Sequence, residues 1–477
     1  MGSGRDVVRR TLYWAAVAVM GTLLSLASGC AAPIGEDQRP NIVLFLVDDL
    51  GWRDVGFMGS SYHETPHIDS IAAQGMVFSH AYANAPNCAP SRAALMSGMY
   101  APRTGVYTVS PPDRGRARDR RLVPAANVNF IEPEVITIAE RLRGSGYATC
   151  ISGKWHIGRH DGPTGPIAQG FDRNIGGYRK GHPDSYFSPY GNPALQDGPD
   201  GEYLTDRLTD DVVAFLEEPR DEPFFLYFPY YTVHTPIQPR PDLLSKTQTR
   251  AGDALHDHAG YAAMVAALDE SVGRVLDALD RIGASDNTLV VFSSDNGGHG
   301  GYTRMDPLRG SKGMMWEGGT RVPFAARWPG RIAPGTASDV PIMLFDLYPT
   351  FSRLGGSDLP ADQPIDGVSL IPILNGKTME ERPIFWHFPA YLQKYGFMSE
   401  PWRATPSSAV RLGDFKLIES FETETVMLFN LIEDPGEVED LADKMPEKRD
   451  QLLGILREWQ SSVGAPREFE ANPRYRP

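Results

Sequence analysis

The segment Cys88-Ala-Pro-Ser-Arg92 places a thiol four residues before a guanidinium group. Its proline and serine suit the first turn of a helix, and the Ala-Ala-Leu-Met run that follows continues that helix. Asn87 or Cys88 then lies at the amino end, where free backbone N–H groups favour an anion or a polarised oxygen. Cys88 is therefore either a structural cysteine near a helix start or a thiol activated for chemistry.

Other chemically capable side chains follow four apolar segments that have the character of buried strands, at residues 41–47, 147–151, 223–228 and 287–292. In open α/β sheets, ligands bind at the carboxyl ends of the strands, so groups placed there converge. A solvated Asp-Asp-Leu-Gly turn is the alternative for residues 48–51. The groups in question are Asp48, Asp49, Lys154, His156, His234, Asp295, Asn296 and, in a later loop, Lys312.

The pattern of elements predicts an α/β fold with a large, mostly parallel sheet flanked by helices. Helices are expected at residues 65–76, 134–143, 204–216 and 261–282. Loops are expected at 101–129 and at 171–201, and the second is long enough to suggest a binding lid. Short strands at 384–388, 408–411, 415–418 and 427–430, with a helix at 447–460, predict a small antiparallel sheet covered by a helix. We therefore expect a catalytic domain at 40–375 and a C-terminal subdomain at 376–477.

The amino terminus has the features of an export signal. Three arginines precede an apolar run at residues 12–26, which is too short to span a bilayer and ends in Leu26-Ala-Ser-Gly-Cys30. The ending resembles a bacterial lipoprotein box, although Ala27 stands where leucine is usual. We expect a signal peptide at 1–29, lipidation of Cys30 and a tether at 30–39, which makes the protein an exported, periplasmic or outer-membrane lipoprotein. An uncleaved anchor or a simple signal peptide is the alternative.

The composition excludes one class of partner. The 477 residues are 41% hydrophobic and 10% aromatic, as in a globular protein with a large core. The formal charge is −14 and there is no long basic run, so we expect no nucleic acid partner and no membrane contact beyond the lipid. An anionic substrate remains compatible, because a bound cation and a few basic side chains can dominate a pocket.

The motif formed by Cys88, Pro90, Ser91 and Arg92, with Ser97 and Gly98 after it, resembles the signature of the formylglycine-dependent sulfatases. From residue 41 to the end the chain resembles a type I sulfatase of the alkaline phosphatase superfamily. The resemblance implies an alkaline phosphatase-like fold. It also implies that a formylglycine-generating or equivalent maturation enzyme converts Cys88 to an aldehyde. With Cys88 converted and Cys30 lipidated, Cys150 is left as a buried, inert thiol, and no internal disulfide forms.

The same resemblance implies a calcium site with four protein ligands. All four are hard oxygen donors, so we expect Ca²⁺ in preference to Mg²⁺. Zinc is not expected, because no Cys/His cluster competes for the role, and His256 and His258 are interpreted as part of a solvated loop. The residues that match the family's calcium ligands are Asp48, Asp49, Asp295 and Asn296.

The nucleophile of the family is a formylglycine hydrate, which here corresponds to Cys88. Arg92 and the cation are implied to keep the attacking oxygen partly anionic. Attack on sulfur transfers the sulfate to the protein and expels the substrate alcohol. Lys154 matches a residue that binds both the sulfate and the diol, so one lysine contacts substrate and nucleophile together.

Three further residues match family positions that contact the reacting groups. Lys312 and His234 correspond to residues that touch the sulfate and the leaving oxygen, with His234 as the proton donor. His156 corresponds to the base that removes a proton from the second diol oxygen, which releases sulfate and regenerates the aldehyde. Several charges around one sulfate are needed, because a single well-placed donor supplies only about 3–4 kcal/mol.

The substrate is the least constrained part of the interpretation. The family acts on sulfated sugars, glycosaminoglycan ends, steroids and aryl esters. The export signal, the 171–201 loop and His387 with Tyr391 suggest a sugar pocket, in which His299, His182 or Arg304 could contact hydroxyl groups. We expect exo-hydrolysis of a sulfated galactose or N-acetylgalactosamine type unit. The alternatives are a broad arylsulfatase, a phosphonate monoester hydrolase or phosphodiesterase, and a surface glycan-binding lipoprotein with unmodified Cys88.

Overall fold

The computed structural model describes residues 32–35, 39–253 and 255–476. The expected signal peptide and Cys30 lie outside these residues. Part of the expected tether packs on the body of the protein, because Ile34 is buried and its N–H donates to Asn375 Oδ1 at 2.6 Å. In the part of the chain that is described, helices long and apolar enough to cross a bilayer are absent.

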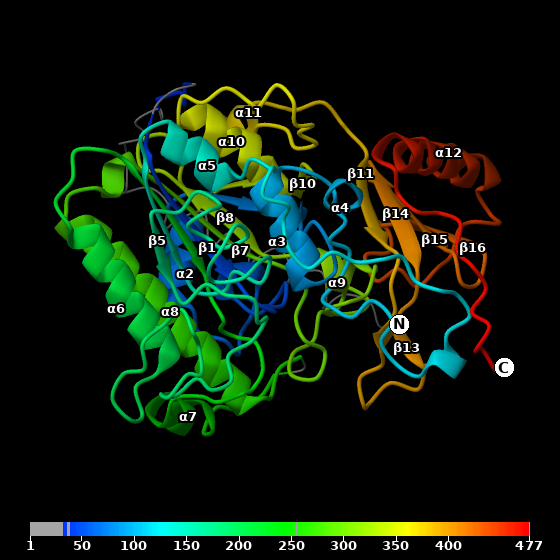
Figure 1. Cartoon of the computed structure of the whole chain (residues 1–477), viewed down its shortest axis with the longest axis horizontal. Coiled ribbons are helices and arrows are strands. Elements are labelled where there is room, and N and C mark those ends of the chain that lie inside the picture. The colour runs from blue at the N-terminus through cyan, green and yellow to red at the C-terminus, as the bar shows by residue number, and fades with distance from the viewer. Residues whose placement is uncertain (1–31, 36–38, 254, 477) are drawn as a thin grey trace, which may run out of the picture.

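The centre of the molecule is an eight-stranded sheet with the strand order β5-β4-β6-β1-β7-β8-β2-β9 (Figure 1). All neighbours pair in parallel except β8, which is antiparallel to both β7 and β2. This confirms the expected large, mostly parallel sheet. The strands are β1 (Asn41–Val47), β2 (Met76–Phe78), β4 (Ala148–Ser152), β5 (Arg173–Ile175), β6 (Phe224–Pro229), β7 (Thr288–Ser294), β8 (Phe324–Arg327) and β9 (Thr336–Ser338).

Strand β1 shows why its apolar run is continuous. Ile42, Leu44 and Leu46 belong to one hydrophobic core, whereas Val43 and Phe45 belong to another on the opposite face. Successive side chains of a strand point to opposite faces, so a sheet covered on both sides needs apolar residues at every position. A separate two-stranded sheet is formed by the parallel pairing of β3 (Ala81–Tyr82) with β10 (Ile342–Met343).

Helices cover both faces of the sheet (Figure 1). One face packs against α2 (Pro66–Ala73), α6 (Leu204–Glu217) and the long α8 (Ala259–Arg281), which has α7 (Pro241–Thr247) against it. The other face packs against α3 (Cys88–Ser97), α5 (Ile138–Gly144) and α10 (Leu347–Leu354). The shorter helices are α4 (Ala101–Thr104), α9 (Glu317–Thr320) and α11 (Ile371–Leu374).

Helix α5 begins four residues later than the sequence predicts. Thr137 Oγ1 accepts the N–H of Glu140 at 3.1 Å, and the Glu140 carboxylate accepts the N–H of Thr137 at 2.8 Å. This reciprocal capping box fixes the first turn at Ile138. The apolar residues at 135 and 136 therefore precede the helix although they fit its spacing.

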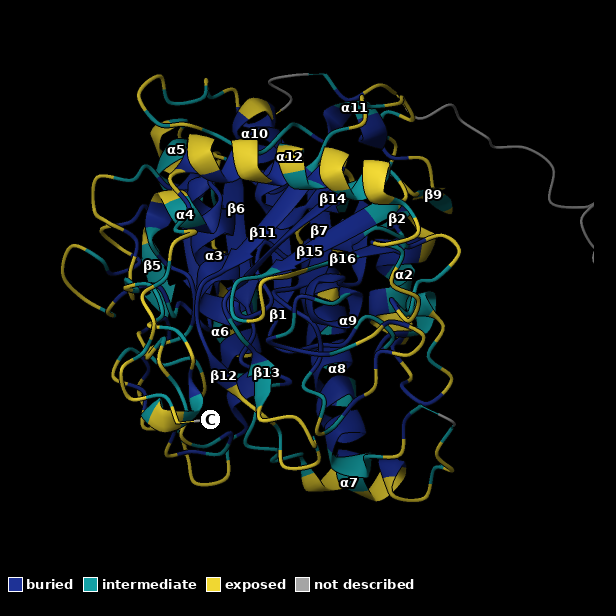
Figure 2. Ribbon diagram, turned by 90° about the vertical axis from the view of Figure 1, so that its right-hand side faces the viewer, coloured by how far each residue is buried: buried dark blue, intermediate teal, exposed yellow. Residues whose placement is uncertain are grey.

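The C-terminal region forms the predicted small antiparallel sheet, in the order β11-β14-β15-β16. One face of this sheet packs against α12 (Pro446–Val463), whose outer side is exposed (Figure 2). Trp459 of α12 stacks on Phe385 with ring centroids 4.5 Å apart. The strands are β11 (Ile384–Phe388), β14 (Ser407–Leu412), β15 (Phe415–Ser420) and β16 (Thr425–Asn430), with a separate pair, β12 (Leu392–Gln393) and β13 (Trp402–Ala404).

A buried charge cluster connects this small sheet to the main body. Lys416 of β15 places its Nζ 3.0 Å from a carboxylate oxygen of Glu317, at the start of α9, and 3.0 Å from one of Glu437. Tyr82 of β3 donates to the other oxygen of Glu317 at 2.7 Å. All four side chains are buried, and Lys416 is the cation that the two carboxylates share, although Arg321 also lies 3.7 Å from Glu317.

We expect Lys416→Met to lower the free energy of unfolding by about 3–5 kcal/mol, because it removes the cation that two buried carboxylates share and leaves Glu437 without an ion pair among the described residues. Urea denaturation followed by tryptophan fluorescence measures this loss. The control is Lys444→Met, since Lys444 is exposed and pairs with Glu439 on the surface, where an ion pair contributes about 0–1 kcal/mol. Equal losses in the two variants would contradict the structural role of the cluster.

Candidate active site

Helix α3 carries Cys88 at its first position, as the sequence predicts. Asn87 precedes it in an extended conformation, and Gly98 ends the helix with φ 73°, where its N–H donates to the carbonyl oxygen of Ala94. All ten helical residues are buried, and Cys88 is 1% exposed. Burial raises the pKa of the Cys88 thiol to about 11, so the unmodified thiol is protonated at neutral pH.

The four expected oxygen donors come together at the ends of two adjacent strands. Parallel pairing aligns Val47 of β1 with Ser294 of β7, so the residues that follow each strand lie side by side. Asn296 Nδ2 donates to Asp49 Oδ1 at 2.9 Å, and the N–H of Asp49 donates to Asp295 Oδ1 at 3.4 Å. Asp48, Asp49, Asp295 and Asn296 are all fully buried.

Three cations balance the three carboxylates. Arg92 Nε lies 2.8 Å from Asp295 Oδ2, and Lys154 Nζ lies 2.6 Å from Asp48 Oδ2. Lys312 Nζ lies 2.6 Å from Asp49 Oδ1. Each cation comes from a different element: α3, the loop after β4 and the loop before α9.

The pKa values of the neighbouring groups Asp48 and Asp49 are shifted in opposite directions. Burial raises the pKa of Asp48 to about 7, against the opposing effect of Lys154. Burial acts in the same direction on Asp49, but Lys312 and His234 hold the pKa of Asp49 well below its ordinary value. Asp49 therefore stays ionised throughout the neutral range, next to the cavity.

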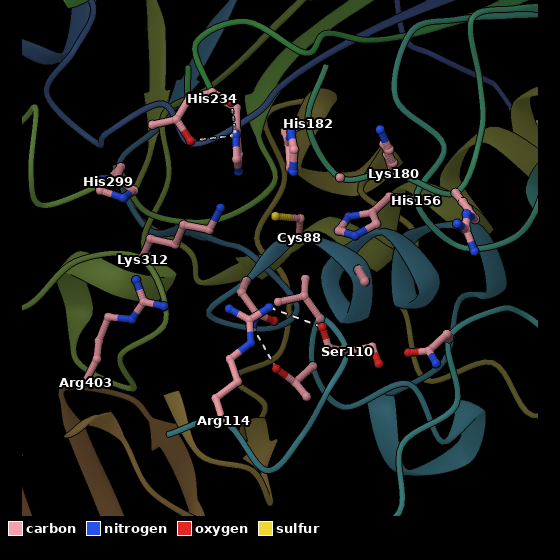
Figure 3. A pocket seen from close by; sticks show the side chains of 18 residues that line it. Cys88, Ser110, Arg114, His156, Lys180, His182, His234, His299, Lys312 and Arg403 are labelled. Carbon is pink, nitrogen blue, oxygen red and sulfur yellow. Dashed lines mark hydrogen bonds between the residues drawn. The ribbon is translucent and has the colours of Figure 1, made fainter. Parts of the chain in front are cut away.

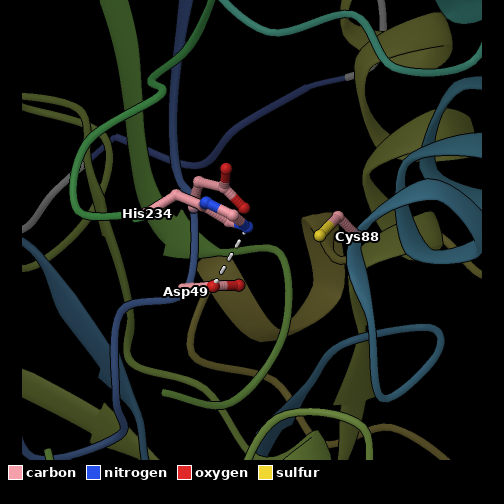
Figure 4. Close-up of side chains that lie close together, drawn as sticks. Asp49, Cys88 and His234 are labelled. Atoms are coloured by element: carbon pink, nitrogen blue, oxygen red, sulfur yellow. Dashed lines mark ion pairs between the residues drawn. The ribbon is translucent and has the colours of Figure 1, made fainter. Parts of the chain in front are cut away.

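The donor set fits a hard divalent cation. Asp48 Oδ1 and Asn296 Oδ1 are buried and accept no hydrogen bond from the described residues. An unpaired buried oxygen is costly, and carboxylate and amide oxygens are the ligands that Ca²⁺ takes in proteins. Oxygen atoms of Asp48 and Asp49, the Cys88 sulfur and a ring nitrogen of His234 all lie within 4.8 Å of one another. Figure 4 shows Asp49, Cys88 and His234 of this group.

The two histidines expected to move protons lie on either side of Cys88 (Figure 3). His234 Nδ1 lies 2.8 Å from its partner, the carbonyl oxygen of Thr235, and Nε2 lies 3.5 Å from Asp49 Oδ2. His156 has a left-handed backbone, φ 63°, and its Nδ1 has no hydrogen-bond partner among the described residues. Burial, with Lys154 and Arg92 nearby, holds the pKa of His156 well below its ordinary value.

A cavity of about 650 Å³ opens over Cys88 (Figure 3). Of the residues identified from the sequence, Cys88, His156, His234, Lys312 and His299 line it, whereas Arg92 and Lys154 are fully buried and do not. The two expected loops, 101–129 and 171–201, both contribute to its wall.

Some expected substrate contacts are elsewhere. His387, expected in the sugar pocket, does not line the cavity: it is buried in β11, with Nδ1 2.6 Å from Ser408 Oγ. Tyr391 is also buried, and its hydroxyl accepts the N–H of Leu122. Alternation along β11 explains the error, because Trp386 and His387 point to opposite faces of a sheet that is covered on both sides. His182 lines the cavity, but Arg304 does not.

The expectation that His256 belongs to a solvated loop is wrong. His256 is buried with its Nε2 3.2 Å from Asp54 Oδ1, and His63 Nδ1 lies 3.7 Å from the same oxygen. Tyr261 of α8 donates to the other oxygen of Asp54 at 2.6 Å. Asp54 lies just beyond the Asp48-Asp49 pair, so this network holds the turn after β1 against α8. His258 caps α8 by accepting the N–H of Tyr261.

Sequence reasoning missed several residues that line the cavity, among them Ser110, Arg114, Arg179, Lys180 and Arg403. Most come from irregular segments, and Arg403 comes from a three-residue strand. Hydrophobic periodicity says nothing about where such segments point. The only signal was compositional, namely the Arg- and Pro-rich run in the 101–129 loop.

Two family models match this chain: one described as Sulfatase over residues 40–357, and one described as N-sulphoglucosamine sulphohydrolase, C-terminal, over residues 310–458. The chain belongs to the sulfatase family. It is a type I sulfatase of the alkaline phosphatase superfamily, and thus a sulfuric ester hydrolase. The first match spans the main sheet and the site described above, and the second spans the small sheet.

Individual relatives support the same assignment for this sulfatase. It is 32% identical to a sulfatase of Formosa agariphila, over 94% of each chain. It is also 32% identical to the N-acetylgalactosamine-6-sulfatase of Mus musculus, over 94% of this chain and 91% of the relative. The crystal structure of Ps i-CgsB in complex with k-i-k-neocarrahexaose superposes with a TM-score of 0.73 at 31% identity, over 88% of this chain and 93% of the other.

We expect Lys312→Met to lower kcat/KM for an aryl sulfate by about 10²- to 10³-fold, as the loss of one positioned donor at a developing charge does. Lys312 both lines the cavity and neutralises Asp49, so the variant removes a positive charge from the cavity wall beside Cys88. Lys246→Met is the control, because Lys246 is exposed on α7. Thermal unfolding of both variants separates a kinetic defect from a folding defect; unchanged kcat/KM in folded Lys312→Met contradicts the assignment.

Proposed function

We propose that this sulfatase hydrolyses a sulfate ester of a saccharide, using formylglycine derived from Cys88 and a Ca²⁺ ion held by Asp48, Asp49, Asp295 and Asn296. One observation carries the proposal: a buried cysteine at the amino end of α3 faces a cavity directly above three buried carboxylates and their cations. The names of similar proteins support a saccharide, since they include N-acetylgalactosamine-6-sulfatases and an enzyme crystallised with an oligosaccharide.

The calcium assignment is supported by the buried oxygens that lack a hydrogen-bond donor. Asp48 Oδ1 and Asn296 Oδ1 are free to act as ligands, and Asp49 and Asp295 complete the donor set. Bound there, Ca²⁺ would polarise the sulfate and stabilise negative charge on the attacking oxygen. Arg92 and Lys154 keep Asp295 and Asp48 in place, so the donor set is arranged before any ion binds.

The formylglycine assignment is supported by the chemistry of the unmodified residue. A protonated, buried thiol is a weak nucleophile, and a cysteine offers only one atom for attack. The hydrated aldehyde supplies two oxygens on one carbon, one to attack sulfur and one whose deprotonation allows the sulfate to leave. Cys88 lies in the first turn of α3, where free N–H groups stabilise a polarised oxygen.

The chain's own residues account for binding and proton transfer. Lys312 Nζ, at the cavity wall, binds the sulfate oxygens. His234 directs Nδ1 to a carbonyl oxygen, so Nε2 is the atom that can carry a proton into the cavity. Burial and Lys312 hold the pKa of His234 well below its ordinary value, against the effect of Asp49, so a proton carried there passes readily to the leaving oxygen. His156, held neutral by burial and by adjacent cations, is suited to accept a proton on the other side of Cys88.

For the sugar itself we propose a galactose or N-acetylgalactosamine type unit at the end of a chain. The similarity to N-acetylgalactosamine-6-sulfatases, at 32% identity, is the support for this choice. Sulfate release from saccharides that differ only in the sulfated sugar tests it, with an aryl sulfate and an aryl phosphonate as references. Faster hydrolysis of the phosphonate than of every sulfate would overturn the proposed reaction.

We expect both Cys88→Ala and Cys88→Ser to lose at least about 10³-fold in kcat, because neither side chain can supply the two oxygens on one carbon. Ion chromatography of released sulfate measures turnover, and the peptide mass at residue 88 reports conversion in the wild type. Cys150→Ser is the matched control, since Cys150 is a buried thiol in β4 that does not line the cavity. Multiple turnover by Cys88→Ala would refute the proposal.

We expect EGTA treatment to reduce both activity and the midpoint of thermal unfolding, and added Ca²⁺ to restore them. A ligand that binds only the folded state stabilises it by about 2.7 kcal/mol at a concentration of 100 Kd. Asn296→Leu removes one oxygen donor without changing the net charge, so it should need more Ca²⁺ for the same unfolding midpoint. An unfolding midpoint that does not respond to Ca²⁺ in the wild type would exclude the ion.

A further inference from the structure

The cavity over Cys88 carries more positive charge than one sulfate requires. Among the described residues that line it there is no aspartate or glutamate, although the whole chain has a formal charge of −14. Lys312 belongs to the sulfate site, and Lys180 is neutralised by Asp184 at 2.5 Å. Two partly buried arginines, Arg114 and Arg403, have no role in the proposed reaction (Figure 3).

Arg114 lies in the irregular segment between α4 and α5. Its Nη2 donates to the carbonyl oxygen of Ser110 at 3.3 Å, and no carboxylate of the described chain lies within ion-pair distance of it. Neighbouring arginines of the same segment differ: Arg116 pairs with Asp119 at 2.7 Å, and Arg120 pairs with Asp113 at 3.4 Å. Arg121 of this segment also has no ion pair to a described residue, but it lies over the ring of Tyr475 and does not line the cavity, whereas Arg114 does.

Arg403 reaches the same cavity from β13. Its guanidinium carbon lies 4.3 Å from the centre of the Tyr395 ring, and its Nε is buried without an acceptor among the described residues. The side chain passes over Gly313, where a Cβ atom would lie 2.8 Å from that Nε. Gly313 also has φ 86°, so a glycine beside Lys312 both permits the turn and leaves room for the arginine.

The guanidinium groups of Arg114 and Arg403 repel each other electrostatically. Burial and the positive charge of Arg403 lower the pKa of Arg114. Like charges close together in a partly buried site repel, and this cost is removed when an anion binds between them. Guanidinium groups suit this role, because their planar fork donates two parallel hydrogen bonds to a carboxylate or a sulfate.

We propose that Arg114 and Arg403 form a second anion subsite, which binds a further sulfate ester or carboxylate on the saccharide whose sulfate is hydrolysed at Cys88. The inference rests on the proposed function and narrows its substrate to saccharides with at least two anionic groups. A substrate with one sulfate leaves both arginines unpaired, and a site built for a polar group discriminates against analogues that lack it.

The test compares kcat/KM for three saccharides that share the hydrolysable sulfate: one without another charge, one with a second sulfate ester and one with a carboxylate. We expect the wild type to favour a doubly anionic substrate by about 10- to 100-fold, the range for a hydrogen bond to a charged group. Arg114→Met and Arg403→Met should each lower this preference about tenfold or more, mainly through KM. The two charged substrates show whether sulfate or carboxylate is preferred.

Arg118→Met is the matched control, because Arg118 lies in the same segment, is exposed and does not line the cavity. It should leave the preference unchanged. Arg114→Lys and Arg403→Lys retain the positive charge but lose the two parallel hydrogen bonds of the guanidinium group, so they should keep part of the preference for doubly anionic substrates. If a methionine variant fails to fold, the corresponding lysine variant takes its place in the test. No preference in the wild type, or equal losses on all three substrates in the arginine variants, would overturn the subsite.

An aryl sulfate and the same compound bearing a carboxylate separate this proposal from the proposed function. If only the aryl pair is hydrolysed, the saccharide assignment fails, while the effect of the arginines on the ratio still tests the subsite. Calorimetric titration of Cys88→Ser with the doubly sulfated saccharide gives a readout independent of turnover. The double variant Cys88→Ser/Arg403→Met should bind this saccharide about tenfold or more weakly than Cys88→Ser does. Equal affinities of the two proteins would count against the subsite.

Discussion

The burial of three carboxylates at the ends of two adjacent strands is the constraint on which the rest of this structure depends. An uncompensated buried charge costs several kcal/mol, so Asp48, Asp49 and Asp295 require partners from elsewhere in the chain. Those partners, Arg92 and two lysines, come from α3 and from two distant loops. Neutralising the carboxylates therefore brings the segments of the site together, and the helix that supplies Arg92 is the one that begins with Cys88. Asp49 itself adopts a left-handed backbone conformation, φ 64°. Its buried contacts with Asn296 and Lys312 hold this strained conformation.

The part of the site that sequence could predict is the part that follows regular structure. A run such as residues 41–47 is apolar at every position only if both faces of the strand are covered, and parallel strands in one sheet end at the same edge. That reasoning predicted that the groups after the strands, Asp48 and Asp295 among them, can converge at one edge of the sheet, and the resemblance grouped these two as metal ligands. The roles of individual side chains, by contrast, came from the resemblance of the motif at Cys88, because spacing along the chain cannot distinguish a proton donor from a base.

What sequence could not predict depends on side-chain direction in irregular or doubly covered segments. His387 has the residue type of a substrate contact, yet β11 is covered on both faces and turns it into the interior. His256 looks solvated beside Asp257, but the carboxylate of Asp54, two hundred residues away, holds it in the interior. Arg403 lies in a short strand, and its side chain points into the cavity because Gly313, which lacks a Cβ atom, leaves room for it. In each case a long-range contact decides the outcome, and no local pattern encodes that contact.

The C-terminal region is connected to the site in two ways, through its four-stranded sheet and through the separate β12–β13 hairpin. Through Lys416 it is joined to Glu317 of α9, and the carbonyl oxygen of Gly319 in that helix accepts the N–H of Gly297, next to the oxygen donors after β7. The hairpin that contains Arg403 closes one side of the cavity, where the hydroxyl of Tyr395 donates to the backbone of Lys312. A change in the small sheet can therefore alter the reaction centre without touching it.

The cationic side chains of the site fall into two groups. Arg92, Lys154 and Lys312 form ion pairs with the buried carboxylates, which fixes the positions of these side chains. Arg114 and Arg403, at the cavity wall, have no ion pair among the described residues. A carboxylate beside these arginines would compete with any anion that enters the cavity, so the absence of acidic residues from its described lining lets an acidic protein present a positively charged pocket.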